Sequence, residues 1–448
     1  MFEEVHENMY RLRRLFAGQA SPFEQERTAS HLMRCRPCRL LAARAVAVQK
    51  AKGPIAVQGL LRSLLDLHEI EQAGVAERLE AEATWAEIRS LSTKARRDKV
   101  RLTRTLHTLS FLEALLEEGA VAGTPTESEE IFYLALLVAG QLPSAEYSSE
   151  LKNDLCAECC AEIANARRRQ ARWPTARDTL RKGIEYVEKG AGDGSAEGRI
   201  LSVAGALEYD LGNIEEARRA LLRAAELFKT AGEAFLLSRT LSQLAYTLVD
   251  SDPAESLRIV EEALESIPSS NPRLLVFAEG IRIDGLLAIG AADEALLRFD
   301  DLKDLHEQFR EPFIQLRRRF TAARILEHLG RTQKAETLFQ EVIAGDLEHG
   351  LMKDFFLDLV YLFGFYLRRG KTEDAIGVCR RASQELSLVD DEDGNSEPAR
   401  DQMRQVWRNL EEEVRKGTVD LGVTTVLRNY IKAHWRTPAS EPPTFGSA

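Results

Sequence analysis

The sequence of 448 residues predicts an all-α fold in which helix hairpins stack on one another with a period of about forty residues. The first observation is a small residue that recurs at spacings of 41, 39, 39, 40 and 40 residues. The second is a turn residue, in most repeats a Gly, five positions before each small residue. The third is apolar residues at helical spacing on both sides of the turns. The recurring small residues are Ala176, Ala217, Ser256, Ala295, Ala335 and Ala375.

Each repeat is predicted to be two antiparallel helices, A and B, joined by the turn. A Gly permits the positive φ that ends helix A, and Ala171 and Ser251 take its place in the first and third repeats. A second small residue in helix A lets the two helices approach closely. One hairpin cannot bury both of its faces, but six stacked hairpins form a continuous core and a curved solenoid. The turn glycines are Gly212, Gly290, Gly330 and Gly370, and the small residues of helix A are Ala164, Gly205, Ala245, Gly285, Ala323 and Gly364.

Composition and pattern divide the chain into four predicted parts. Residues 1–53 form a basic head, with ten Lys and Arg against five Asp and Glu. Residues 54–145 are predicted to be helices without a clear repeat, which serve as a linker or as a cap on the first hairpin. The repeats occupy residues 146–390. Residues 391–448 contain two further helices and a Pro- and Ser-containing tail that is predicted to be disordered.

The overall composition excludes several classes of protein. Hydrophobic residues make up 44% of the chain and charged residues 29%, as in ordinary globular proteins. The longest apolar segments are too short to span a bilayer, and acidic residues near the amino end do not fit a signal peptide. We therefore expect a cytoplasmic protein without a membrane partner. The net charge of −11, despite the basic head, leaves an acidic body that argues against direct nucleic-acid binding.

One group of residues in the basic head has the chemistry of a metal site. Ser21 begins a predicted helix, on which His31 and Cys35 are four residues apart and therefore share a face. Cys38 completes a Cys-x-x-Cys pair at the end of this helix, and His6 on a preceding helix is the candidate fourth ligand. Two imidazoles and two thiolates suit tetrahedral Zn²⁺. The alternative is a chance spacing of buried cysteines and surface histidines.

The segment HLMRCRPCR resembles the zinc-binding anti-sigma domain of bacteria, over about residues 1–50. The resemblance implies that His6, His31, Cys35 and Cys38 hold Zn²⁺ and that the head binds a sigma factor. Many members of this family continue into a membrane-spanning helix, whereas this pattern implies a soluble regulator. The alternatives left open are a purely structural zinc site and a redox switch in which the two thiolates oxidise and release the metal.

The segments LGNIEEARRALLRAAELF and HLGRTQKAETLFQEVI resemble helix B of tetratricopeptide (TPR) repeats, although the period here is longer than usual. The resemblance covers about residues 146–387, and the third and fourth repeats are degenerate because Ser256 replaces Ala and Gly285 is displaced. It implies that a peptide or protein binds the concave surface of the solenoid. The main hypothesis is therefore a regulator with a sigma-factor-binding head, and the alternative is a general TPR scaffold or adaptor.

No catalytic motif emerges, so the protein is not expected to be an enzyme. The Gly-rich segment KGAGDGSAEG lacks the Lys-Ser/Thr pair of a phosphate-binding loop and is predicted to connect two repeats. Cys156, Cys159 and Cys160 share one face of the first helix A, where small apolar side chains are needed for packing. We interpret these three thiols as buried and inert, and Cys379 as a core residue of the sixth helix B.

Overall fold

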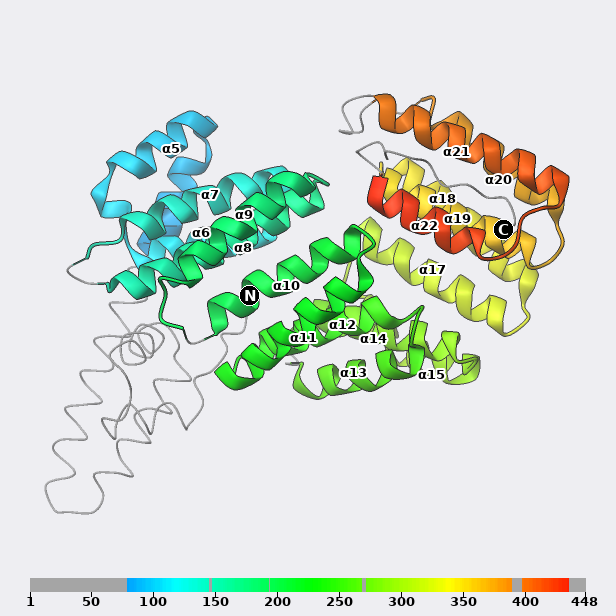
Figure 1. The fold of residues 1–448 in the computed structure, drawn as a ribbon, viewed down its shortest axis with the longest axis horizontal. Coiled ribbons are helices and arrows are strands. Elements are labelled where there is room, and N and C mark those ends of the chain that lie inside the picture. Colours follow the sequence, from blue (N-terminus) through cyan, green and yellow to red (C-terminus); the bar gives the residue numbers. More distant parts are fainter. Residues whose placement is uncertain (1–78, 145–146, 193, 268–270, 389–396, 435–448) are drawn as a thin grey trace, which may run out of the picture. The chain divides into compact units, whose positions relative to one another are not determined.

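The computed structural model describes residues 79–144, 147–192, 194–267, 271–388 and 397–434 (Figure 1). Within these ranges every regular element is a helix, as the sequence predicts. None of these helices is long and apolar enough to cross a membrane. The predicted zinc ligands lie outside the described residues, so the zinc site stays a prediction; they are His6, His31, Cys35 and Cys38.

The chain forms two compact units. The first holds the described residues up to Leu207 together with Ala220–Thr240. It starts with a helix over residues 79–89. The following helices of this part of the chain are α5 (Thr93–Leu102), η1 (Arg104–Leu106), α6 (Leu109–Val121), α7 (Pro125–Gln141), α8 (Ser149–Arg169), α9 (Trp173–Val187), α10 (Ser195–Asp210) and α11 (Ile214–Ala231).

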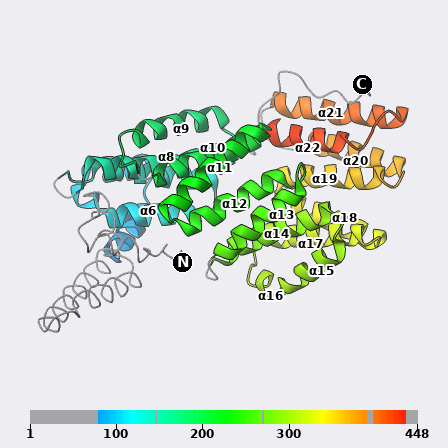
Figure 2. The same cartoon turned by 60° about the horizontal axis from the view of Figure 1, so that its bottom comes forward.

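The second unit holds Glu208–Arg219 and the described residues from Leu241 onward. After the last repeat, α21 (Glu397–Lys416) packs against α20 (Thr372–Glu385), and α22 (Val423–His434) packs against α19 (Met352–Leu367) (Figures 1 and 2). The helices of this part are α12 (Ala234–Leu248), α13 (Pro253–Ser266), α14 (Pro272–Ala288), α15 (Ala292–Asp301), α16 (Lys303–His306), α17 (Pro312–His328), α18 (Thr332–Glu348), α19 (Met352–Leu367), α20 (Thr372–Glu385), α21 (Glu397–Lys416) and α22 (Val423–His434). Helices α8, α10, α12, α14, α17 and α19 are the A helices of the six repeats, and α9, α11, α13, α15, α18 and α20 are the B helices.

The turns within the hairpins follow the predicted backbone chemistry in five repeats of six. The four turn glycines have positive φ values of 64° to 84°, and Ala171 adopts the same left-handed conformation at φ 52°. The prediction is wrong at Ser251, which does not take positive φ. There the chain ends helix A differently, because the Asp252 side chain caps the next helix by accepting from the Glu255 N–H, and Pro253 occupies its first turn.

The small residues pack the two helices of a hairpin together. All the predicted small residues of the B helices are fully buried. In the third repeat Ser256 Oγ donates to the Ala245 carbonyl at 2.8 Å, so the two small positions of that hairpin touch directly. Gly364 has a different role from the one predicted. A Cβ there would lie 2.8 Å from Thr424 Cγ2, so this Gly makes room for α22 rather than for helix B of its own hairpin.

Each unit has its own apolar core. In the second unit, the rings of Phe320, Phe339, Tyr361 and Phe365 form one cluster with contacting centroids 5.1 to 5.6 Å apart, edge-to-face in three pairs and tilted between Phe339 and Tyr361. In the first unit, the helices from residue 79 to α7 share a single apolar cluster with α8, on which they pack. The cores therefore run from one hairpin to the next, as stacking requires.

The cysteines of the described repeats are buried thiols, as the sequence predicts. Cys156 and Cys159 belong to the apolar cluster between the first helices and α8, and Cys160 and Cys379 are also buried. Burial raises the pKa of Cys156 to about 12 and that of Cys160 to about 11. These thiols are therefore protonated at neutral pH and poor nucleophiles.

Candidate binding face on the A helices

Polar and aromatic side chains of the second unit form a row along successive A helices, which we call the A-helix face. Its members lie on successive A helices, and neighbouring members contact one another across the repeats. They lie on α10, α12, α14, α17 and α19 (Figure 2). The A-helix face consists of Tyr209, Tyr246, Phe277, Asp284, Arg317, Arg324 and Tyr361.

One end of the A-helix face is aromatic. The rings of Tyr209 and Tyr246 have centroids 5.4 Å apart, and those of Tyr246 and Phe277 are 6.1 Å apart. Tyr246 is 38% exposed and Phe277 44% exposed. Burial nevertheless raises the pKa of the Tyr246 hydroxyl, because protein surrounds the ring on several sides. Both rings are therefore partly open to solvent, and an apolar side chain of a partner can pack against them.

The other end of the A-helix face is charged. Arg324 bridges two neighbouring A helices, because it forms an ion pair with Asp284 and donates from Nε to the Tyr361 hydroxyl at 2.8 Å. Burial opposes the charge on Arg324, but the adjacent Asp284 and Tyr361 raise the pKa of the guanidinium overall. Arg317 lies over the Phe320 ring at 4.7 Å, and its side chain remains 38% exposed. This end therefore holds two guanidinium groups in fixed positions, of which Arg317 is the more exposed.

The C-terminal helix α22 brings another cation to the aromatic end. Arg428 on α22 forms an ion pair with Asp250 at 2.8 Å, although the two residues are 178 positions apart. The positive charge of Arg428 also lies close enough to lower, in part, the otherwise raised pKa of Tyr209. Leu427 and Ile431 anchor α22 in the core of the second unit. Helix α22 is therefore a fixed part of the second unit and lies next to the A-helix face.

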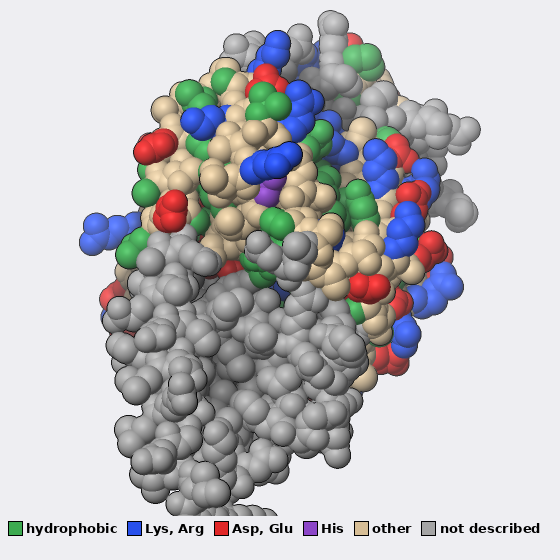
Figure 3. All heavy atoms as spheres, turned by 90° about the vertical axis from the view of Figure 1, so that its left-hand side faces the viewer, with side chains coloured by type: hydrophobic (Ala, Val, Ile, Leu, Met, Phe, Trp, Pro, Cys, Tyr) green, Lys and Arg blue, Asp and Glu red, His purple; other side chains and the backbone are tan. Residues whose placement is uncertain are grey.

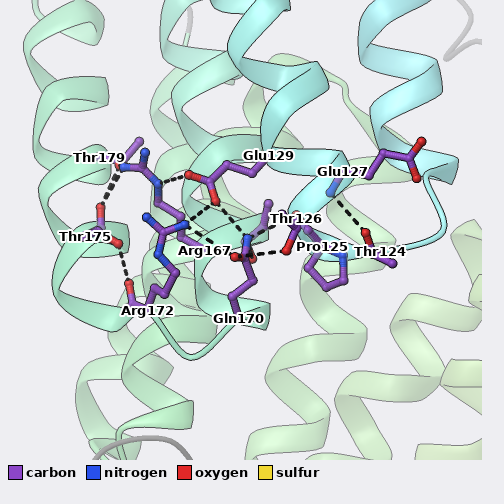
Figure 4. Close-up of polar contacts among 11 residues, drawn as sticks. Thr124, Pro125, Thr126, Glu127, Glu129, Arg167, Gln170, Arg172, Thr175 and Thr179 are labelled. Carbon is purple, nitrogen blue, oxygen red and sulfur yellow. Dashed lines mark hydrogen bonds and ion pairs between the residues drawn. The ribbon is translucent and has the colours of Figure 1, made fainter. Parts of the chain in front are cut away.

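A separate polar network ties the first repeat to the preceding helix (Figure 4). Glu129 on α7 accepts hydrogen bonds from Arg167 Nε and Arg172 Nη1 at 2.7 Å each, and from Gln170 Nε2 at 2.9 Å. Burial alone would raise the pKa of Glu129, but the bonds from Arg167 and Gln170 and the charge of Arg172 lower it overall. Arg167 also donates to Thr179 on α9 at 2.6 Å. The Glu129 carboxylate is fully engaged, so we interpret this network as structural.

The end of the first unit near α5 is a weaker candidate. The sequence of α5 carries Lys94, Lys99 and Arg101 on its exposed side, with Asp98 as its single acidic residue. Figure 3 shows acidic and basic side chains interspersed over the described part of this end. Such a surface is typical of a solvated helix. Among the described residues no group of His, Cys, Asp and Glu is arranged to hold a metal ion.

Comparison with known proteins gives information about the fold. No protein-family model matches the chain, and no curated protein matches it. Among solved structures, the chain is similar to a Rap protein complexed with Competence and Sporulation Factor, with a TM-score of 0.54 and 15% sequence identity. The match covers 76% of this chain and 88% of that chain. The fold is TPR-like. At this low identity the similarity concerns the fold alone.

The TPR-like fold could be predicted from the sequence, but the A-helix face could not. Taken one from each helix, its members read Tyr209, Tyr246, Asp284, Arg324 and Tyr361 along the chain. Tyr occurs at three of these positions, but Asp284 and Arg324 interrupt it, and the distance from each to the small residue of its helix differs from repeat to repeat. The row becomes visible only when the repeats are compared by the side-chain contacts between their A helices, which the structure supplies, and not by their Gly and Ala positions.

Proposed function

We propose that this protein is a TPR-like adaptor or regulator that binds a protein or peptide partner on the A-helix face of its second unit. The observation that carries the proposal is the pair of partly exposed, adjacent rings of Tyr246 and Phe277, with the cation Arg317 near Tyr246. Aromatic and Arg side chains are the residues that contribute most to binding energy at protein interfaces.

The arrangement supports binding of a folded or extended segment with an apolar anchor. An apolar partner side chain packed on Tyr246 and Phe277 gains by leaving water. Arg317 and Arg324 can then pair with partner carboxylates or carbonyls without losing their own partners, because each guanidinium offers five donors. The fold similarity to a Rap protein solved in complex with Competence and Sporulation Factor supports a role in binding a partner.

A role in binding rather than catalysis is part of this proposal. In the described residues, the thiols are buried and protonated, and their raised pKa values leave no activated nucleophile among them. The arginines of the A-helix face are paired with carboxylates that hold them in place. Arginines held in this way can recognise the shape and the negative charge of a binding partner.

The sequence pattern of the head supports a second, more specific function. A zinc site formed by His6, His31, Cys35 and Cys38 would stabilise residues 1–53, which are too few to bury a secure core without metal. In this form of the proposal, the head binds a sigma factor in the cytoplasm and the A-helix face receives the signal. The alternative is that zinc stabilises the head of a general adaptor.

The test of the binding face uses affinity-tagged full-length protein in an extract of its own cells. We expect Tyr246→Ala combined with Phe277→Ala to reduce recovery of the bound partner about thirtyfold, as loss of a binding hot spot does. The matched control is Leu297→Ala, which removes an exposed apolar side chain from helix B of the fourth repeat. Equal recovery with all three proteins would rule out the A-helix face as the binding surface.

A further inference from the structure

Three helices of the second unit bring two aspartates and one arginine together next to the A-helix face. Asp346 on α18 and Asp358 on α19 are each only 2% exposed. Arg317 on α17 donates from Nη1 to Asp358 Oδ1 at 3.1 Å. The carboxyl groups of Asp346 and Asp358 are hydrogen-bonded to each other. One buried carboxyl pair therefore faces a single cation, which is itself partly exposed at the binding face.

This geometry requires a shared proton. Two carboxylate oxygens only accept, so a hydrogen bond between the aspartates exists only when one of them is protonated. Asp346 holds the proton, because Asp358 is the carboxylate that pairs with the Arg317 guanidinium. Burial, followed by the charge of Asp358, raises the pKa of Asp346 to about 8. At neutral pH the Asp346 hydroxyl thus donates to the Asp358 carboxylate.

Asp358 is the group whose protonation changes the A-helix face. Burial raises the pKa of Asp358 to about 6, although Arg317 and Asp346 oppose this shift. The other charged group on α19 near the pair is Asp354, which raises both pKa values further. Besides Asp358, the groups that favour the charged form of Arg317 are Asp354 on α19, Tyr246 on α12 and Asp284 on α14. A second proton on the pair would leave Arg317 without its buried counter-ion.

We propose that proton uptake by Asp358 releases Arg317 from the core to the A-helix face, so that partner binding there is linked to pH. This inference rests on the proposed function of the face. The released guanidinium keeps its contact with the Phe320 ring and becomes available to an acidic side chain of the partner, which replaces Asp358 as its counter-ion. Binding of an acidic partner would therefore strengthen as the pH falls through the slightly acid range.

The experiment observes Arg317 directly in the full-length protein and needs no partner. Nitrogen-15-labelled arginine is incorporated, and the Arg317 Nε–H resonance is identified by its loss in Arg317→Lys. We expect this resonance to titrate in the wild type with a midpoint near the pKa of Asp358, about 6. In Asp358→Asn the resonance should stay at its low-pH position throughout. The Arg324 resonance, whose partner is Asp284, is the internal control.

Asp346→Asn tests the shared proton. An Asn amide donates to Asp358 as the Asp346 hydroxyl does, so the Arg317 midpoint of about 6 should remain, whereas any change of this resonance at about pH 8, where Asp346 loses its proton, should disappear. An Arg317 resonance that does not move between about pH 5 and about pH 8 in the folded wild type would overturn the proposal. Because the readout is made without a partner, it separates this inference from the binding function, which the recovery experiment tests independently.

Discussion

Replacing Glu129 with Ala removes the acceptor of three hydrogen bonds where α7, α8 and α9 meet. The bond from Arg167, whose side chain is largely buried, should contribute about 1.5 kcal/mol. The bond from the half-exposed Arg172 should contribute about 0.5 kcal/mol, and the bond from Gln170 about 1 kcal/mol. The predicted loss is about 3 kcal/mol, which equals roughly hundredfold faster amide exchange in α8.

Amide hydrogen exchange of the full-length protein, read by mass spectrometry, measures this loss locally. A single unfolding free energy is poorly defined for a chain with two units, whereas peptides from α7 to α9 report on the junction itself. The pH dependence has a definite sign. Because the pKa of Glu129 is lowered in the fold, its contribution is present above the ordinary Glu value and is lost as the pH falls through the folded value.

The matched control is Glu216→Ala on α11. Glu216 also pairs with an arginine, Arg219, but both side chains are more than half exposed and lie one helical turn apart. We expect no measurable change in exchange there, because exposed pairs contribute little. Exchange in α8 that rises less than threefold in Glu129→Ala would refute the reasoning that partial burial gives this network its strength.

Three further predictions concern the core, the acid pair and the head. Phe339→Ala empties a fully buried site beside Phe320, Tyr361 and Phe365 and should destabilise the second unit by about 3–5 kcal/mol, as measured by exchange in α17 to α19. Because the pKa of Asp346 is raised in the fold from 3.8 to about 8, stability of this unit should fall as the pH rises between these two values, by up to about 1.4 kcal/mol per pH unit, and level off above about 8. Asp346→Asn should flatten that slope, which thermal melts at several pH values would detect, whereas a slope unchanged by the substitution would contradict the assignment. Purified full-length protein should contain zinc that His31→Ala and Cys35→Ala lack, as measured by elemental analysis, and equal metal content in all three would remove the predicted site.

The sequence predicts the hairpins well because their determinants are local. A Gly five residues before an Ala fixes both the turn and the close helix crossing, and neither depends on distant residues. The exceptions occur where distant residues intervene. At Ser251 the cap supplied by Asp252 replaces the left-handed turn, and at Gly364 the missing side chain makes room for Thr424 from α22. Nothing in the period of the repeat encodes that last contact.

The candidate site depends on contacts between repeats and could not be predicted in the same way. Arg317 and Asp358 meet only because two A helices stack side by side, and Arg428 reaches Asp250 only because α22 folds back on α19. Each of these residues alone resembles an ordinary solvated charge in the sequence. The predicted zinc ligands of the head lie outside the described residues, and that prediction is open to the metal analysis.

The polar contacts between neighbouring A helices are of three kinds along the stack. One pair of helices is joined by two hydroxyls. Two pairs are joined by an acid on the earlier helix and an arginine on the later one, and one pair by an arginine on the earlier helix and an acid on the later one. At most other places in the series, a hairpin would therefore face a neighbour whose polar group does not match its own. These contacts thus favour one order of the hairpins along the chain. Duplication or exchange of single hairpins would be selected against even when the apolar core tolerates it. The steps are Ser202 with Thr240, Glu158 with Arg199, Asp284 with Arg324, and Arg317 with Asp358.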